Sequence, residues 1–252
     1  MACGVREDLS YDQKMKIPNR SLIKRIALTT YRPLRPLLRV VGVDAKGLYE
    51  WAYWKSRQIE ESTLRNDWYE EIFTRCVGID KDFYNNKKIL DIGCGPRGSL
   101  EWADMAAERV GLDPLVERYR SLGIDHHSTH YVNAPAEHIP YPDSYFDVVT
   151  SINSLDHVDD VDAAMREMIR VVAPTGMILI IVEIHPKPTI AEPHVLSWEL
   201  TRSFEPMMRV TEERHLEHPM GGPSYFDVQT PFDHEDKTER SGMLIAKMVK
   251  QV

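Results

Sequence analysis

Two carboxylates and a group of glycines are the first residues in this chain whose types and spacing suit chemistry. Gly93, Gly95 and Gly98 stand close together, and a backbone without Cβ atoms accepts positive φ and lets a ligand lie against it. Asp91 comes just before the first glycine, and Asp113 follows 22 residues later. An acid at this second place accepts hydrogen bonds from both hydroxyls of a ribose in nucleotide-binding folds. The spacing therefore predicts a nucleoside site.

Two parallel strands are needed to bring these residues together. Apolar runs at 88–92 and 109–112 each end beside one of the acids, which is typical of strands buried on both faces. Between them, residues 99–106 predict the first turns of a helix capped by Ser99, whose amino-terminus would favour an anion. A dinucleotide also fits such a turn, but Asp91 would repel a pyrophosphate and suits the cationic amino-acid end of S-adenosylmethionine.

With these residues in place, the chain resembles the class I S-adenosylmethionine-dependent methyltransferases over residues 87–184. Further segments match the family pattern in sequence order: Asp113 to Leu115, Ala134 to Asp143, Phe146 to Ser151, Asn153 to Val158, and Ala163 to Gly176. The resemblance implies an α/β fold, namely a Rossmann-like, mostly parallel sheet of seven strands with an antiparallel last hairpin. It implies S-adenosylmethionine as the cofactor and methyl transfer as the reaction.

The same resemblance implies cofactor contacts at the ends of successive strands. The residues that it assigns to the cofactor are Asp91, Gly93, Cys94, Gly95, Asp113, Pro114, Ala136, Glu137, Ser151 and Asn153. Relatives carry an acid for the adenine amino group where this chain has Pro135, so we expect Ala136 and Glu137 to hold the adenine instead. Arg97 replaces a small residue of the family, and we expect it at the surface.

Residues 151–157 follow the fourth strand, and in this family that loop lies beside the transferred methyl group. Asn153 is expected to orient the acceptor. His157 titrates near neutrality and suits a general base toward a hydroxyl or an amine. A cap for the next helix, or a place in the core, is the other interpretation of His157.

Composition sets the organisation of the rest of the chain. The net charge is −8, yet residues 14–39 carry eight basic residues and no acid, which leaves the remainder at −16. An acidic body disfavours nucleic acid as substrate. Residues 1–45 are predicted to be a basic arm that folds back on this body or makes weak contact with an anionic membrane surface or a partner.

Residues 46–252 are predicted to form the methyltransferase domain. Within it, 46–80 form a cap of two helices, and 185–210 form a substrate lid with a helix over 196–204. Strands at 225–229 and 242–249 would complete the sheet. We expect Trp54, His185, His194 and Trp198 to contact substrate. We expect no metal site, because the spacing of the lid histidines across prolines is not a known ligand pattern.

These observations favour an enzyme that methylates a hydroxyl or an amine of a small molecule, sugar or secondary metabolite. An acceptor at the membrane, such as a lipid, quinone or lipid-linked glycan, is the alternative. A non-catalytic binding module is a different class, although a lapsed cofactor site has no need of both acids. No stretch approaches 18 apolar residues, no secretory signal is evident, and the three cysteines are scattered, so we expect a cytoplasmic protein.

Overall fold

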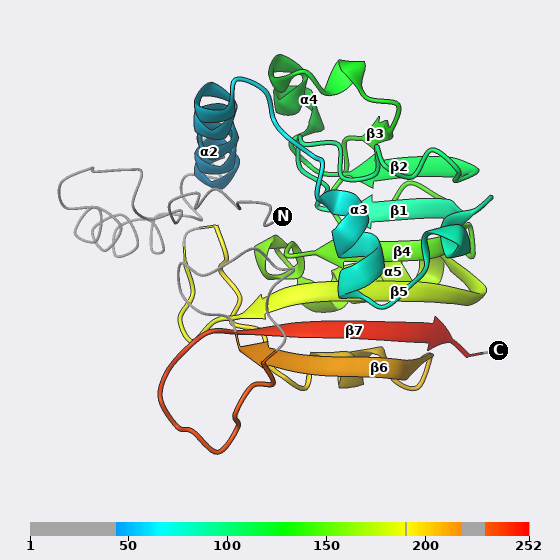
Figure 1. Cartoon of the computed structure of the whole chain (residues 1–252), viewed down its shortest axis with the longest axis vertical. Coiled ribbons are helices and arrows are strands. Elements are labelled where there is room, and N and C mark those ends of the chain that lie inside the picture. The colour runs from blue at the N-terminus through cyan, green and yellow to red at the C-terminus, as the bar shows by residue number, and fades with distance from the viewer. Residues whose placement is uncertain (1–43, 190, 218–229, 252) are drawn as a thin grey trace, which may run out of the picture.

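A single sheet of seven strands organises the computed structural model, which describes residues 44–189, 191–217 and 230–251. The strands are β1 (Lys88–Ile92), β2 (Glu108–Leu112), β3 (His130–Val132), β4 (Phe146–Ile152), β5 (Val172–Ile184), β6 (Met208–Glu217) and β7 (Gly242–Lys250). Their order is β3-β2-β1-β4-β5-β7-β6. The first five run parallel, and β7 is antiparallel to both β5 and β6. The predicted fold class is confirmed (Figure 1).

Helical segments surround this sheet. They are α2 (Ala45–Glu61), α3 (Tyr69–Glu71), η1 (Ile72–Cys76), η2 (Lys81–Tyr84), α4 (Val116–Tyr119), η3 (Arg120–Leu122), η4 (Ile124–His126), η5 (Leu155–His157), α5 (Val161–Val171) and η6 (Leu200–Phe204). Asp44 and Asp160 cap α2 and α5, since their side chains accept hydrogen bonds from the Gly47 and Ala163 amides. The two helices predicted before the first strand are present as α2 and the short run from α3 to η1.

Both faces of the central strands are buried, which explains their unbroken apolar runs. Successive residues of β1 point to opposite sides, so Ile89 joins one apolar cluster and Leu90 joins the other. Met168 of α5 belongs to the cluster of Leu90, and Phe73 of η1 belongs to that of Ile89. The sheet is therefore fixed between two helical layers, and its strand ends are held in place.

The predicted helix over 99–106 is wrong, because these residues form turns. Residues 99–107 must lead from the glycine turn back along the sheet to the start of β2. A helix advances only about 1.5 Å per residue, against roughly 3.3 Å for extended chain, so a stretch this short cannot be helical and still return. Ser99 does not cap a helix. Its hydroxyl donates to Asp91 Oδ2 at 2.5 Å.

The sixth strand also differs from its prediction. β6 covers Met208–Glu217, so the predicted lid 185–210 ends inside it, and residues 225–229 lie outside the described part. β6 is an edge strand rich in charge, which masks the apolar alternation that marks a strand. The predicted helix at 196–204 is reduced to η6.

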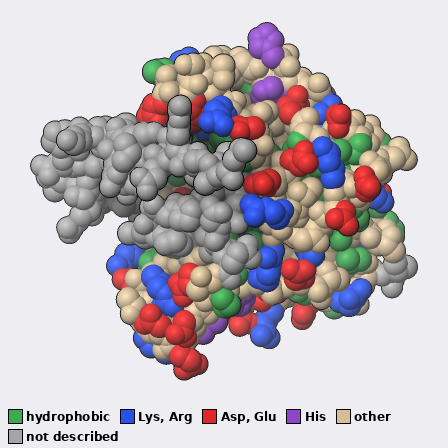
Figure 2. Space-filling view, viewed as in Figure 1, with side chains coloured by type: hydrophobic (Ala, Val, Ile, Leu, Met, Phe, Trp, Pro, Cys, Tyr) green, Lys and Arg blue, Asp and Glu red, His purple; other side chains and the backbone are tan. Residues whose placement is uncertain are grey.

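Two expectations concern surfaces and termini. Residues 1–43 of the predicted arm lie outside the described residues. On the face drawn in Figure 2, acidic and basic side chains of the described residues are interspersed, whereas nucleic-acid binding needs a continuous basic surface. A search of the described helices found none long and apolar enough to cross a membrane.

Candidate functional site

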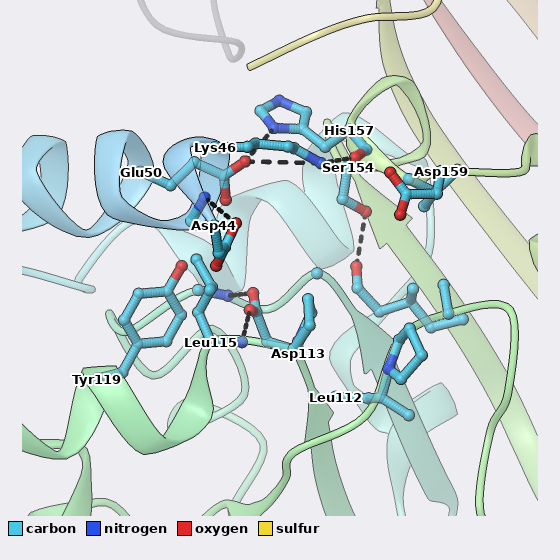
Figure 3. A pocket seen from close by; sticks show the side chains of 18 of the residues that line it. Asp44, Lys46, Glu50, Leu112, Asp113, Leu115, Tyr119, Ser154, His157 and Asp159 are labelled. Atoms are coloured by element: carbon cyan, nitrogen blue, oxygen red, sulfur yellow. Dashed lines mark hydrogen bonds and ion pairs between the residues drawn. The ribbon is translucent and has the colours of Figure 1, made fainter. Parts of the chain in front are cut away.

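A pocket of about 510 Å³ opens at the carboxyl ends of β1, β2 and β4. Its size falls in the range that holds cofactors and small ligands. Strand order reverses between β1 and β4, and open α/β sheets bind ligands at such a switch point. The amino-terminal half of α2 forms the opposite wall (Figure 3).

The glycine turn forms the floor of this pocket. Gly93 has φ +67°, and a Cβ there would lie 2.3 Å from Ser154 Cβ. Gly95 has φ +58°, and a Cβ there would lie 3.3 Å from the Trp54 ring. The turn needs glycine for its positive φ, as the sequence predicted, and also for close packing against Ser154 and Trp54.

Asp113 lies at the end of β2, lines the pocket and is 6% exposed. Its Oδ1 accepts a hydrogen bond from the Leu115 amide at 2.8 Å, and Oδ2 accepts one from the Gly95 amide at 3.2 Å. Burial raises the pKa of Asp113 to about 7, and the charge of Glu50 adds to the rise. The carboxylate is therefore held in one orientation, with lone pairs left for hydroxyl donors (Figure 3).

Asp91 is placed differently, because it lies behind the turn and does not line the pocket. Its carboxylate is 2% exposed and accepts hydrogen bonds from the hydroxyls of Ser99 and Thr150, at 2.5 and 2.7 Å. Burial raises its pKa to about 6, although both hydroxyls favour the ionised form. Asp91 thus joins the turn to β4.

The other residues assigned to the cofactor divide in the same way. Pro114, Ala136, Glu137 and Asn153 line the pocket, whereas Cys94 and Ser151 do not. Cys94 packs against Gly111, where a Cβ would lie 2.8 Å from its Sγ. Ser151 Oγ is 2.7 Å from Ser154 Oγ. These two residues support the lining from behind.

The Glu137 side chain, expected to hold the adenine, is partly committed within the protein. Its Oε1 accepts hydrogen bonds from the amides of Asp159 and Asp160, at 2.6 and 2.9 Å. Glu137 therefore braces the loop that leads into α5 while it borders the pocket.

The charges around the pocket are mostly negative. Among the described lining residues, the acids are Asp44, Glu50, Asp113, Glu137 and Asp159, and the basic ones are Lys46 and His157. Such a lining attracts a cationic ligand and repels a pyrophosphate. The charged residues of the lining therefore fit a sulfonium compound better than a dinucleotide.

Residues of α2 are the part of the lining that sequence reasoning largely missed. Trp54 was predicted and lines the pocket, but Asp44, Lys46 and Glu50 line it as well. Lys46 Nζ donates to the His157 carbonyl and lies 3.8 Å from Glu50 Oε1. The only sequence signal for this wall was a candidate N-cap, Asp44, followed by two charged residues, Lys46 and Glu50, that are four residues apart.

Arg97 is buried, so its predicted surface position is wrong. Its guanidinium makes two contacts of 2.7 Å with the carboxylate of Glu61, and it donates to the Arg65 carbonyl. The rings of Trp54 and Trp68 lie 5.3 and 5.0 Å from it. The hydrogen bond from Arg97 lowers the pKa of Glu61 to about 2. This pair fastens the end of α2 to the glycine turn.

His157 and Asn153, the predicted catalytic residues, both line the pocket. His157 Nδ1 lies 3.4 Å from Glu50 Oε1 (Figure 3). Burial lowers the pKa of His157, but the contact with Glu50 and the charge of Asp156 outweigh it and raise the pKa. Asn153 has φ +51°, and its side-chain oxygen accepts from the Glu183 amide at 3.2 Å. Its backbone shape is one that asparagine tolerates well.

The lid residues expected to contact substrate lie outside this pocket. His185 Nδ1 is 2.7 Å from the Lys187 carbonyl, and His194 Nε2 is 3.0 Å from the Val158 carbonyl. Both histidines therefore lie against the loop after β4. Trp198 instead packs on Phe232, with ring centroids 4.6 Å apart, near the start of β7.

Sequence comparison matches residues 90–180 to the methyltransferase domain family. A ubiquinone/menaquinone biosynthesis C-methyltransferase UbiE from Vibrio parahaemolyticus is 42% identical over 110 residues, 38% of this chain and 40% of that protein. UbiE from Vibrio campbellii is 48% identical over 89 residues, 34% of this chain and 32% of that protein. The chain thus spans well under half the length of these relatives.

Solved structures share the fold at low sequence identity. A complex of the Haloferax volcanii Trm112 methyltransferase activator with a methyltransferase matches with a TM-score of 0.57 at 15% identity, over 83% of this chain and 99% of that chain. The N-methyltransferase NodS of Bradyrhizobium japonicum, bound to S-adenosyl-L-homocysteine, gives 0.51 at 12%, over 73% and 86%. The [4+2]-cyclase SpnF gives 0.50 at 20%, over 68% and 78%. These proteins are named for different reactions, so this fold does not fix the chemistry.

Proposed function

We propose that this chain, through its class I S-adenosylmethionine-dependent methyltransferase domain, transfers a methyl group from S-adenosylmethionine to a small-molecule acceptor. The observation that carries the proposal is the fixed carboxylate of Asp113 in a pocket whose charged lining residues are mostly acids. The bound cofactor supplies an electrophilic methyl group on a sulfonium leaving group.

The protein's part in cofactor binding follows from the lining. Asp113 would accept hydrogen bonds from the ribose hydroxyls, while Pro114 and Ala136 border the adenine. The methionine end would lie on Gly93 and Gly95, where no Cβ obstructs it. Asp91 would act indirectly, by holding the turn in shape through Ser99 and Thr150.

The acceptor would enter between α2 and the loop after β4. Asn153, His157 and Glu50 border this end of the pocket, and we propose that they orient the acceptor for in-line attack on the methyl group. Aligning two reactants is the main contribution that such a reaction needs from a protein.

We propose a hydroxyl or amine of a small molecule, sugar or secondary metabolite as the methylated group, in a cytoplasmic setting. The second candidate is a quinone or other membrane-associated acceptor, and the UbiE names of the relatives support it. However, the family match covers only residues 90–180. The wall beyond it, α2, is where a different acceptor would be recognised.

Calorimetry with S-adenosyl-L-homocysteine tests the cofactor site. Asp113→Asn should bind it about 10- to 100-fold more weakly, because a charged acceptor of two hydroxyls is lost. Asp125→Asn is the matched control, since Asp125 is an exposed acid paired with Arg120, and its affinity should stay unchanged. Equal binding by both variants, or tight binding of a nicotinamide dinucleotide instead, would overturn the proposal.

Acceptors are distinguished by assaying labelled cofactor with panels of alcohols, amines and quinols. Transfer to quinols alone would favour the second candidate. Co-sedimentation with anionic vesicles, comparing the full chain with one lacking residues 1–40, tests the proposed contact of the arm with a membrane. Binding without transfer to any acceptor class would favour the non-catalytic module.

A further inference from the structure

A buried carboxylate without hydrogen bonds lies beside the acceptor end of the pocket. Asp156 is 1% exposed, and neither of its side-chain oxygens accepts a hydrogen bond from any described group. An ionised carboxylate in such a place is costly unless a cation or donor compensates it. Asp91 and Asp113, which are equally buried, each accept two hydrogen bonds.

Two imidazole rings face the two oxygens of Asp156. His157 Nε2 lies 3.9 Å from Oδ1, and His185 Nε2 lies 3.6 Å from Oδ2. Both separations are too long for hydrogen bonds. The rings are nevertheless held in place through their other nitrogens, by Glu50 Oε1 at 3.4 Å and the Lys187 carbonyl at 2.7 Å.

These outer contacts determine what the rings present to Asp156. A carbonyl only accepts, so Nδ1 of His185 carries the hydrogen, and Nε2 of the neutral ring offers a lone pair. His185 Nε2 is itself buried without a hydrogen bond. A lone pair that faces a carboxylate is repelled by it until a proton or a metal cation lies between them. Contacts from the far nitrogen to a carboxylate or carbonyl are the usual outer partners of metal-binding histidines.

A second carboxylate completes the cluster. Asp156, His157 and Glu192 each place one ligand atom so that the three atoms lie within 4.8 Å of one another. Ligands of a tetrahedral ion with bonds near 2.1 Å stand about 3.4 Å apart, which is close to the separations seen around Asp156. Glu192 is oriented in turn, because the Thr189 hydroxyl donates to its Oε2 at 2.7 Å.

We propose that Asp156, His157 and Glu192 bind a divalent transition-metal ion. Two carboxylates with an imidazole suit Mn²⁺, Fe²⁺ or Zn²⁺. His157 lines the pocket, whereas Asp156 and Glu192 do not, so the ion would lie beside its acceptor end. The inference rests on the proposed function only for the role of the ion, which is to hold an acceptor oxygen and lower the pKa of the acceptor hydroxyl. It makes His157 a ligand, in place of the base expected from the sequence.

Metal binding by the full chain, freed of metal with a chelator, tests the site. Mn²⁺ is followed by electron paramagnetic resonance and Zn²⁺ by calorimetry. We expect one ion per chain, and at least tenfold weaker binding by Asp156→Asn and by Glu192→Gln, because each removes an anionic ligand. Glu199→Gln is the matched control, an exposed glutamate of the same segment, and should bind as the unchanged chain does.

S-adenosyl-L-homocysteine affinity, measured on the same preparations, separates the two proposals. We expect Glu192→Gln to keep this affinity, which shows that the variant is folded. Intact nucleoside binding without binding of Mn²⁺ or Zn²⁺, or equal metal binding by all variants, would overturn the metal site and leave the proposed function standing. Loss of nucleoside binding by the unchanged chain would overturn the proposed function, whatever the metal result.

Discussion

The buried acids at the two ends of the pocket differ in the hydrogen bonds that they accept. At the cofactor end, Asp91 and Asp113 each accept two hydrogen bonds from the turn and the neighbouring strands. At the acceptor end, Asp156 is as buried and accepts none from the described residues. The first end is thus complete before a ligand arrives, and its shape is independent of what binds. At the second end, the buried carboxylate of Asp156 lacks a compensating group, which a bound species must supply.

The largest effect is expected from disturbing the completed end at Gly93. Gly93→Ala places a Cβ 2.3 Å from Ser154 Cβ at a φ of +67°, and Ser154 is held by its hydrogen bond to the Ile92 carbonyl. We expect a loss of about 3 kcal/mol or more in the free energy of unfolding, since overpacking and backbone strain add. Urea unfolding measures it.

Gly78→Ala is the control for this variant. Gly78 has a φ of +62°, yet only Lys247 Nζ would lie near its Cβ, at 3.7 Å. We expect a loss of about 1 kcal/mol from strain alone. Similar losses at both glycines would mean that the contact with Ser154 is unimportant.

The next effect is expected at the ion pair of Arg97 and Glu61, which joins the glycine turn to α2. Replacing Glu61 leaves the buried charge of Arg97 without its ion pair, and we expect a loss of about 3 kcal/mol in stability. Replacing Arg97 should cost less, because Glu61 stays paired with Arg57 at 2.5 Å. A double-mutant cycle with Arg97→Met and Glu61→Gln should give a coupling of at least 1 kcal/mol. The exposed pair Arg65–Asp67 should couple by less than about 1 kcal/mol, and equal coupling in both cycles would contradict the burial of Arg97.

The pH dependence of stability provides a second test of the same ion pair. The pKa of Glu61 falls from 4.5 in the unfolded chain to about 2 in the folded one. The unfolded state therefore binds the proton first, and the stabilisation by Glu61 is complete above pH 4.5 and lost as the pH falls toward 2. Glu61→Gln should lack this part of the acid dependence.

An effect of similar size but opposite sign is expected at Asp91. Its pKa rises from 3.8 to about 6 on folding, so the folded state holds the proton that the unfolded state has lost, and stability falls as the pH rises from about 4 to 6. Asp91→Asn should therefore be more stable than the unchanged chain at pH 8, by up to about 3 kcal/mol, and show little advantage at pH 4. Unfolding by urea at both pH values measures this, and a variant less stable at pH 8 would contradict it.

The smallest effect on the pocket is expected from Trp198. This ring packs on Phe232 and lies outside the pocket lining. Trp198→Phe should leave the affinity for S-adenosyl-L-homocysteine within twofold, while it lowers stability by about 1 kcal/mol through reduced packing. A tenfold loss of affinity would contradict the position of Trp198 outside the pocket.

Local patterns were enough to predict β1 and the turn, whereas the rest of the sheet followed from the family resemblance. β1 has the bounds predicted from its apolar run, and Gly93 and Gly95 adopt the positive φ expected of them. The failures come from contacts between distant residues. Arg97 is buried because Glu61, 36 residues earlier, meets it, and the cluster around Asp156 draws on Glu192 from a separate loop. Neither pairing has a spacing that sequence alone can recognise.

Both ends of α2 are tied to the sheet's ligand-binding edge. Asp44 forms an ion pair with Arg118 at 3.1 Å, and Glu61 forms one with Arg97 at 2.7 Å. A fragment trimmed to residues 90–180, the part that the family match covers, would keep the floor of the cavity but forfeit a whole side of it. A fragment expressed for binding studies should therefore begin before Asp44.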